Sequence, residues 1–525
     1  MTSFYQANTK ILKDEEEDRL SRIKVDRWIF TLLLLAVGLV PLIVGGHART
    51  VISPQITNVA LLSSGVKGDI FTNYKASVLI VIAIIAISLL FSKVFFMSGE
   101  IRKTKLNIFV GIFAIAITIS TILSPSISIA LWGQYNRSDG AISYLCYLAL
   151  FFVAMNIDYP KKALHYVMYS FYPFVIINFI LITMNFYGHD AMIYPIVQKM
   201  MTLFLPEGAS LGDGAIFLGT LNQWNFMSGM FAVMMVMYLA WAIVDKNTIR
   251  SFVNVGVSVM TLAVMLMSIS TSGFLTVLAI TPLLVWLAIK STDRKKAVIA
   301  LCAFVVVSLP VFHVLAEKNP RVWNESIGFI FKKNPYVKEQ PVATVPINFG
   351  LTVENNRVYA AENSFELPVL PGRGTAAGSG RAYIWSKTID LTMDRPIFGF
   401  GLDTIMYHFP HYNIDARAGM RSEHTIVDKP HNMYVGIFYG TGIIGFIGFA
   451  GLAIIMALGG LKAVVTRRSI VPTVFAVGWL AYLIQALFND TLPGTAAPMW
   501  AIAGMMMAFI LRNKEVEEII DGRND

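Results

Sequence analysis

Apolar runs of about 20 residues recur along most of this chain, and they constrain its fold more than any other feature. A helix of this length crosses the hydrocarbon core of a bilayer. Charged residues make up 14% of the 525 residues, against roughly 25% in a soluble domain, and most of them lie between the runs. We therefore predict an all-α integral membrane protein, which excludes a cytosolic enzyme, a disordered chain and a disulfide-stapled secreted module.

The apolar windows predict about 12 transmembrane helices. Their central apolar segments are 28–46, 76–97, 107–123, 140–156, 164–186, 224–244, 253–270, 273–289, 297–316, 432–463, 471–488 and 499–511. The predicted domains are a cytoplasmic N-terminal tail (1–27), transmembrane helices 1–9 (28–316), a large, partly helical extracytoplasmic loop (317–430), transmembrane helices 10–12 (431–511) and a cytoplasmic C-terminal tail (512–525). The large loop thus precedes the antepenultimate span.

Basic residues indicate which side of the membrane each loop faces. Lys and Arg are frequent in alternate short loops such as 98–106 and 290–296, whereas the loops at 124–139 and 187–223 carry one basic residue each. Cytoplasmic loops have this excess of positive charge. We therefore expect both termini in the cytoplasm. The formal net charge of +9 has the same origin, so it does not indicate a nucleic-acid partner.

Few ionisable residues lie inside the predicted spans, whose polar groups are weak ones such as Asn178, Asn254 and Gln485. Ion-coupled transporters and pumps need ionisable groups at membrane depth. Polar, aromatic and chargeable residues instead collect on the outer side, at 131–140, 219–225 and 317–431. This distribution favours an outward-facing site over a transport pathway.

The sequence predicts neither a metal nor another cofactor. Cys146 and Cys302 each lie inside an apolar run and form no redox or ligand motif. The outer loops contain neither an Asp-x-Asp pair nor a Cys/His cluster at metal-ligand spacing.

A helix is predicted to begin near Ser379, a suitable N-cap, and to end near Arg395, before Pro396. Arg381 then stands in its first turn, where free N–H groups and the helix dipole favour anions. A guanidinium there suits a phosphate, although an ordinary surface ion pair explains the residue equally well. The apolar face of this helix is predicted to consist of Ala382, Trp385, Ile389 and Met393.

His431 directly precedes a long apolar run, so it is predicted to lie at a helix N-terminus on the outer interface. The dipole there lowers a histidine pKa and keeps the imidazole able to accept a proton. His431 is therefore a candidate general base. A lone interfacial histidine is, however, more often a satisfied polar residue.

Two smaller outer motifs place binding groups next to spans. One sets Arg137 near Trp132, and the other sets Asn222 and Asn225 beside Trp224. Aromatic rings stack on sugar faces and amides bind hydroxyls, but Trp and Tyr are also common at membrane interfaces.

Four motifs then follow in order: Arg381 to Trp385; Pro396-Ile397-Phe398-Gly399-Phe400-Gly401; His431-Asn432-Met433-Tyr434; and Gly440-Thr441-Gly442-Ile443-Ile444-Gly445. This order, with a large outer loop before the antepenultimate span, resembles the O-antigen ligase and O-antigen polymerase superfamily of bacterial membrane glycosyltransferases. The resemblance covers about two-thirds of the chain.

The resemblance implies a multi-pass protein of the bacterial plasma membrane. It would move a glycan from undecaprenyl pyrophosphate to an acceptor hydroxyl on the outer face, with inversion and without a metal. The acceptor can be a lipid, a glycan or a protein, so ligase, polymerase and protein O-oligosaccharyltransferase activities stay open. A flippase for the same lipid-linked glycan is the alternative of another class.

The resemblance also assigns roles to the candidate residues. His431 and Arg381 would be catalytic, with Arg381 and Arg137 meeting the charge of the leaving pyrophosphate. The substrate-binding residues would be Arg137, Asn222, Asn225, Trp132, Asn432 and Tyr434. Many relatives carry an Arg after a Ser between two central spans, where this chain has Ser270-Thr271-Ser272. Arg321 and Arg421 are candidate substitutes, and the alternative is that the donor is held in a different way.

Overall fold

A computed structural model describes residues 2–57, 59, 61–205, 218–221, 223–331, 333–337, 380–411, 426–467 and 469–521. Within these residues, ten helical segments are long and apolar enough to cross a membrane, and two shorter apolar helices accompany them. Each of the twelve coincides with a predicted span, so the all-α integral membrane fold is confirmed.

The spanning helices are α1 (Thr2–Gly38), α2 (Asn73–Phe96), α3 (Lys105–Ile122), α5 (Ala141–Met155), α6 and α7 (Ala163–Ser170, Tyr172–Phe186), α9 (Trp224–Val244), α10 (Thr248–Met267), α11 (Thr271–Ile289), α12 (Arg294–Lys318), α17 (Met433–Thr466), α18 (Ile470–Gln485) and α19 (Pro493–Asp521). Because α1 is helical from Thr2, most of the segment predicted as a tail (1–27) belongs to the same helix as the first span.

Short elements connect these spans. They are η1 (Val40–Leu42), β1 (His47–Val51), β2 (Gly65–Asp69), α4 (Ile127–Trp132), η2 (Ala191–Ile193), α8 (Pro195–Thr202), α13 (Arg321–Asn324), η3 (Ile327–Phe329), α14 (Arg381–Thr392) and α15 (Ile405–His408). The two strands form an antiparallel hairpin in which His47 faces Asp69 and Val51 faces Gly65.

Side-chain caps set where several spans begin. The Oδ1 atom of Asn247 accepts from Arg250 N (2.9 Å), and that of Asp293 accepts from Lys296 N (3.1 Å). Such caps satisfy N–H groups that have no partner inside the helix. Pro282 and Pro310 lie within α11 and α12, as membrane helices tolerate when neighbours satisfy the freed carbonyls.

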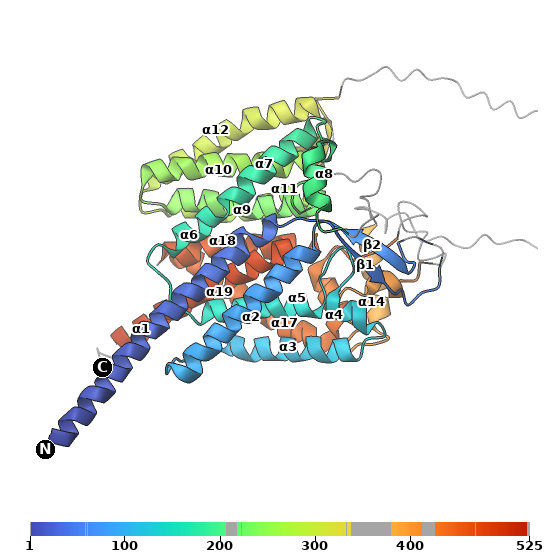
Figure 1. Cartoon of the computed structure of the whole chain (residues 1–525). Coiled ribbons are helices and arrows are strands. Elements are labelled where there is room, and N and C mark those ends of the chain that lie inside the picture. The colour runs from blue at the N-terminus through green and yellow to red at the C-terminus, as the bar shows by residue number, and fades with distance from the viewer. Residues whose placement is uncertain are drawn as a thin grey trace, which may run out of the picture.

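Helix α9 is the centre of the bundle, with 94% of its apolar window buried. It packs against α10, α11 and α18. Small residues allow these close approaches: a Cβ on Gly229 would lie 2.3 Å from Gln485 Nε2, and one on Gly478 would lie 2.4 Å from Met237 Sδ. Figure 1 shows α7 and α10 to α12 on one side of the molecule and α1 to α3, α5 and α17 on the other.

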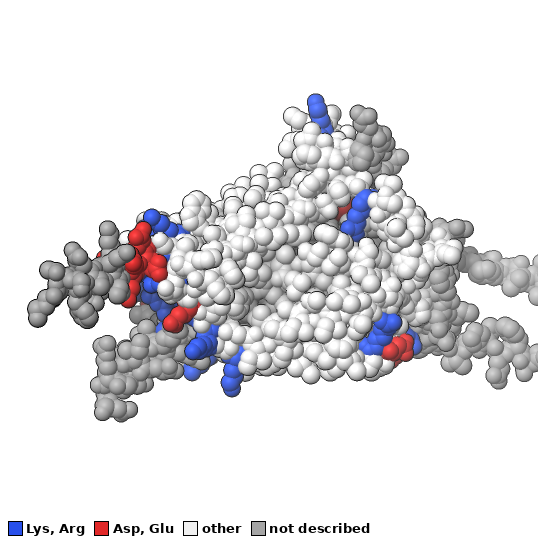
Figure 2. Space-filling model, turned by 60° about the horizontal axis from the view of Figure 1, so that its bottom comes forward, with Lys and Arg blue, Asp and Glu red and all other residues white. Residues whose placement is uncertain are grey.

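The two ends of the bundle differ. The start of α1 and the end of α19 lie at one end, while the hairpin, α4 and α14 lie at the other (Figure 1). On the face seen in Figure 2, charged side chains gather towards the two ends and a largely uncharged belt lies between them. The belt is the surface that a bilayer would cover.

The loop predicted at 317–430 is partly helical, as α13, α14 and α15 show, while its segments 338–379 and 412–425 lie outside the described residues. Two details of α14 differ from the prediction. The helix ends at Thr392, and its N-cap is Gly380 in a left-handed conformation (φ 80°); Ser379 is outside the described residues. The buried face consists of Tyr383, Ile384, Thr388 and Thr392.

The apolar face recognised in the sequence is not the face of α14 that is buried. Ile389 and Met393 are 40% and 55% exposed, because α14 turns its Tyr and Thr side towards the bundle. Thr388 and Thr392 can be buried there because each hydroxyl donates to a carbonyl one turn earlier in the helix.

Candidate active site

His431 occupies a sharp turn at the start of α17. Its backbone is left-handed (φ 52°), and the next residue, Asn432, caps the helix by accepting from Tyr434 N (3.0 Å) and Val435 N (3.2 Å). The indole of Trp385 in α14 donates to Pro430 O at 2.7 Å. A non-glycine residue in this conformation is held by its surroundings. The turn is thus fixed by its cap and by α14.

Two carboxylates flank the His431 ring. Its Nδ1 atom lies 3.1 Å from Asp490 Oδ2, and its Nε2 atom lies 3.9 Å from Asp428 Oδ1. Asp490, in the connection between α18 and α19, also accepts from Asn432 N (3.2 Å). The His431 side chain is 28% exposed, whereas that of Asp490 is 4% exposed. The imidazole is therefore held on one side by the buried Asp490 carboxylate and is accessible to solvent on the other.

Asp490 is held in its charged form. Burial raises the pKa of this carboxyl, but the hydrogen bond from His431 and the charges of His431, Lys429 and Arg137 outweigh it and lower the pKa to about 2. A carboxylate in this position fixes the ring orientation of a histidine and stabilises its protonated form.

Arg137 reaches His431 through Asp428. The Arg137 guanidinium donates to the Asp428 carboxylate, and its side chain is only 3% exposed. Burial raises the pKa of Asp428, but Arg137 and then His431 more than offset this and lower it. Burial likewise lowers the pKa of Arg137, and the surrounding Asp carboxylates outweigh it and raise the pKa. Arg137 is therefore committed to an ion pair in this structure.

A second, more deeply buried group of ion pairs is centred on Lys429, two residues before His431. Lys429 Nζ lies 3.0 Å from Asp139 Oδ2 and 3.5 Å from Asp403 Oδ1, and all three side chains are at most 6% exposed. The hydroxyl of Thr491 also donates to Asp139. Burial lowers the pKa of Lys429, but its two carboxylates outweigh burial and raise it. The group joins three loops that are distant in sequence.

Arg381 is the cation that this network leaves available. It stands in the first turn of α14, and it makes no hydrogen bond or ion pair with any described residue. Burial lowers the pKa of the guanidinium, while the charge of Asp490 acts to raise it. An arginine in such a position is available to bind a ligand anion.

The glycine-rich motifs lock the outer loop onto α17. Phe400 N donates to Tyr439 O (3.0 Å) and Gly401 N donates to Gly440 O (2.9 Å). Gly399 has φ 70°, and Gly442, at φ 62°, interrupts the regular helix of α17. A tight turn at Gly399 and Gly401 thus bonds to the carbonyls of α17 just before this break.

Asn225 belongs to a polar cluster beside the His431 turn. Its Oδ1 atom accepts from Ser270 Oγ (2.8 Å), and its backbone oxygen accepts from Asn489 Nδ2 (2.8 Å). Asn489 O in turn accepts from Met433 N (3.1 Å). The turn that contains Ser270 is thus tied to the start of α17.

The remaining predicted residues are placed differently. Asn432 is the helix cap, Tyr434 donates from its hydroxyl to Leu483 O (2.8 Å), and Trp132 is 50% exposed at the end of α4. Asn222 and Arg421 lie outside the described residues, and Arg321 is exposed. No group of three or more potential metal ligands occurs in the part of the chain that the structure describes.

Sequence reasoning missed the carboxylates. Asp490 and Asp428 are the acids nearest His431, and Asp139 completes the buried ion-pair group. A signal for Asp490 was present, because an acid lies between two apolar runs at 471–488 and 499–511. An ionisable residue at the end of a span indicates a partner nearby.

The O-antigen ligase family model matches residues 256–450, from within α10 to within α17. Through this segment the chain is similar to the O-antigen ligase family. The match includes Arg381 and His431, whereas Arg137, Asn225 and Asp490 lie outside it. A search of curated proteins gave no match. The family match confirms the resemblance seen in the sequence and supports a membrane glycosyltransferase of the O-antigen ligase or polymerase type.

Proposed function

We propose that this protein, which is similar to the O-antigen ligase family over residues 256–450, is a glycosyltransferase. It transfers an oligosaccharide from undecaprenyl pyrophosphate to an acceptor hydroxyl at the outer face of the bacterial plasma membrane, with inversion and without a metal. The proposal rests on two side chains that are influenced by the same carboxylate, Asp490. His431 is accessible and contacts Asp490, and Arg381 makes no ion pair with a described residue. One group suits the acceptor hydroxyl and the other the leaving pyrophosphate.

In the proposed reaction the acceptor oxygen attacks the anomeric carbon while the bond from that carbon to the pyrophosphate oxygen breaks. His431 takes the hydroxyl proton, and the carboxylates of Asp490 and Asp428 stabilise the resulting imidazolium. Arg381 and the free N–H groups at the start of α14 meet the negative charge on the departing pyrophosphate. Inversion follows from a single displacement.

We propose that Arg137 holds Asp428 near His431 and does not itself contact the pyrophosphate. Its ion pair with Asp428 is the basis for this change of role. Asn225 and Asn222 stay proposed contacts for sugar hydroxyls. Trp132, Asn432 and Tyr434 also stay predicted binding residues, although Asn432 and Tyr434 make the structural hydrogen bonds described above.

The test is a reaction in lipid with a purified undecaprenyl-pyrophosphate oligosaccharide and a panel of acceptors, followed by mass spectrometry of the glycan and the released lipid pyrophosphate. Native protein should release lipid pyrophosphate, whereas His431→Ala and Arg381→Ala should lose at least 100-fold in rate. Lys387→Ala removes an exposed charge from the same helix as Arg381 and is the matched control.

The products distinguish the alternatives. Donor consumption only with an added lipid acceptor indicates a ligase, longer lipid-linked chains indicate a polymerase, and a glycosylated polypeptide indicates a protein O-oligosaccharyltransferase. Leaflet exchange of the intact lipid without any transfer would refute the enzyme and indicate a flippase.

A further inference from the structure

A pocket of about 330 Å³ lies at the opposite end of the bundle from His431, between the end of α17, the start of α18 and α19. It is lined by Ile455, Leu458, Gly459, Lys462, Ala463, Thr466, Ser469, Pro472, Met507, Ile510 and Asn513. This is also the end at which α1 begins and α19 ends (Figure 1). The candidate active site makes no use of it.

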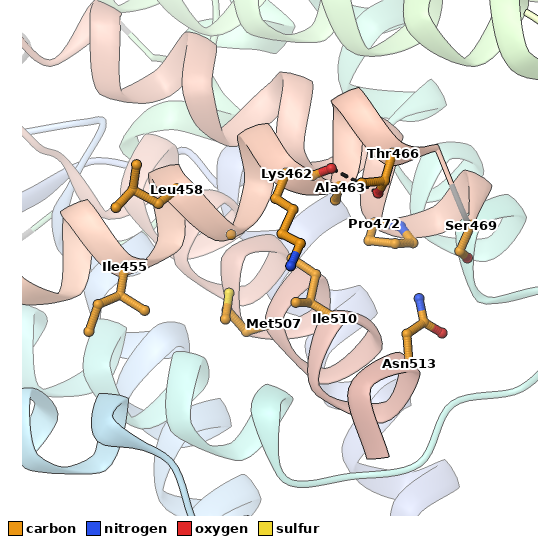
Figure 3. A pocket seen from close by; sticks show the side chains of 11 residues that line it. Ile455, Leu458, Lys462, Ala463, Thr466, Ser469, Pro472, Met507, Ile510 and Asn513 are labelled. Atoms are coloured by element: carbon orange, nitrogen blue, oxygen red, sulfur yellow. Dashed lines mark hydrogen bonds between the residues drawn. The ribbon is translucent and has the colours of Figure 1, made fainter. Parts of the chain in front are cut away.

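The pocket wall changes from apolar to polar in one direction. Along α17, Ile455 and Leu458 are followed one turn later by Lys462, and along α19 Met507 and Ile510 are followed by Asn513. Figure 3 shows the two aliphatic residues of α17 at one side of the pocket and the polar side chains at the other, with the Lys462 amine between them. Both α17 and α19 run towards the end of the bundle that holds the two termini. The change from apolar to polar side chains therefore has the same direction on both helices.

Lys462 supplies a positive charge that no acidic side chain among the described residues neutralises. Its side chain is exposed and makes no ion pair with a described residue, and its carbonyl accepts from Thr466 Oγ1 at 2.8 Å. Ser469, the N-cap of α18, makes no side-chain hydrogen bond to its own helix. The polar end thus offers an ammonium, hydroxyl groups and the first turn of a helix, which together favour an anion.

We propose that this pocket binds one anionic phospholipid from the leaflet at the termini end, with its acyl chain against Ile455, Leu458 and Met507 and its phosphate at Lys462. A lipid is the occupant that fits both the apolar-to-polar direction of the wall and the sign of its charge. The space above Gly459 is open, since an added Cβ would meet nothing nearer than Met507 Sδ at 3.6 Å. An acyl chain can therefore lie against the backbone there.

The experiment is native mass spectrometry of delipidated full-length protein titrated with phosphatidylglycerol or phosphatidylcholine. The native protein should bind one phosphatidylglycerol more tightly than phosphatidylcholine. Lys462→Ala should weaken this binding about fivefold, as expected for one charge near the membrane surface, and Lys462→Arg should retain it. Lys290→Ala removes a cation at the end of α11, outside the pocket, and should leave the binding unchanged.

A second pair of variants tests the apolar part. Gly459→Leu fills the pocket and should abolish the tight site, whereas Gly459→Ala should keep it. Equal affinity for the two lipids, displacement of the lipid by soluble glycerol phosphate alone, or an unchanged affinity in Lys462→Ala would overturn the proposal. Because the readout is lipid binding, its failure would leave the proposed transferase activity untouched.

Discussion

At the residue scale, the candidate active site pairs Arg137 and Lys429 with carboxylates and leaves Arg381 without an ion pair to any described residue. Asp490 and Asp428 face the two nitrogens of His431, and Arg137 and Lys429 hold carboxylates behind them. Taking charges out of water is costly unless each is paired and hydrogen-bonded. The pairing therefore explains how a polar site persists at the outer ends of apolar helices. Arg381, whose guanidinium makes no ion pair with a described residue, is the cation suited to a ligand.

Replacing Asp490 with Asn should lower the turnover number about 100-fold and leave KM little changed, because His431 loses the carboxylate that orients and stabilises its protonated ring. Steady-state kinetics with the lipid-linked donor would measure this. Asp394→Asn changes an exposed acid after α14 and should leave both constants unaltered. An Asp490→Asn protein with native turnover would remove Asp490 from the mechanism.

The depressed pKa of Asp490 also predicts how stability depends on pH. A carboxyl whose pKa is about 2 when folded and roughly 3.9 when unfolded contributes stability that is complete above pH 4 and is lost as pH falls towards 2. Thermal unfolding in detergent between pH 6 and 3 should therefore decline less steeply for Asp490→Asn than for the native protein. Parallel declines would contradict the assignment.

The ion pair between Arg137 and Asp428 should show coupling. Arg137→Ala leaves Asp428 without its partner and should destabilise the fold by roughly 2 kcal/mol, less than for a fully buried pair because Asp428 is 33% exposed. Asp428→Ala in the same protein should restore part of this loss. Thermal unfolding of both single variants and the double variant measures the coupling, and strictly additive losses would exclude it.

At the element scale, α17 is the helix on which the site depends. The outer loop that contains Gly399 and Gly401 packs against α17 where Gly442 breaks the helix. The loop that ends at Gly401 bonds to the carbonyls of Tyr439 and Gly440 just before the break. Because α17 carries His431 at its start and α14 lies directly before this loop, the break fixes Arg381 and His431 relative to each other.

Gly399→Ala should destabilise the protein strongly and remove transferase activity. Gly399 has φ 70°, and an added Cβ would lie 2.4 Å from Tyr439 O, so both its backbone conformation and its contact with α17 would be lost. Gly436→Ala is the matched control in the same region, since its Cβ would meet only Pro430 Cγ at 3.5 Å. Size-exclusion profiles and thermal unfolding would compare them, and equal behaviour of the two variants would refute the argument.

At the scale of the whole molecule, an end with both termini and an end with the candidate site are separated by an apolar belt. Basic loops predict that the termini end is cytoplasmic. In a background with Cys146 and Cys302 replaced by serine, a cysteine at position 394 should react with an impermeant maleimide in intact cells. A cysteine at position 290 should react only after permeabilisation. The reverse pattern would show that the end with both termini faces outwards and would contradict the predicted orientation.

Transfer should continue in the presence of a chelator. The carboxylates around His431 each lie within ion-pair distance of Lys429, Arg137 or His431, so they are engaged by protein cations. Product formation after exhaustive treatment with EDTA, compared with added Mg²⁺ or Mn²⁺, would measure this. Loss of activity with EDTA and its recovery with one of these ions would overturn the metal-independent mechanism.

The sequence alone determined the number and order of the spans, the partly helical outer loop and the resemblance to the O-antigen ligase family, because hydropathy, caps and glycine-rich turns are local signals. It also indicated Arg381 and His431 through their places at helix starts. Only the tertiary structure decided that Asp490 and Asp428 face His431, that Arg137 is committed to an ion pair, and that α14 buries its Tyr and Thr side. These depend on how distant helices pack, and a pair of opposite charges far apart in the chain has no periodicity by which it can be recognised.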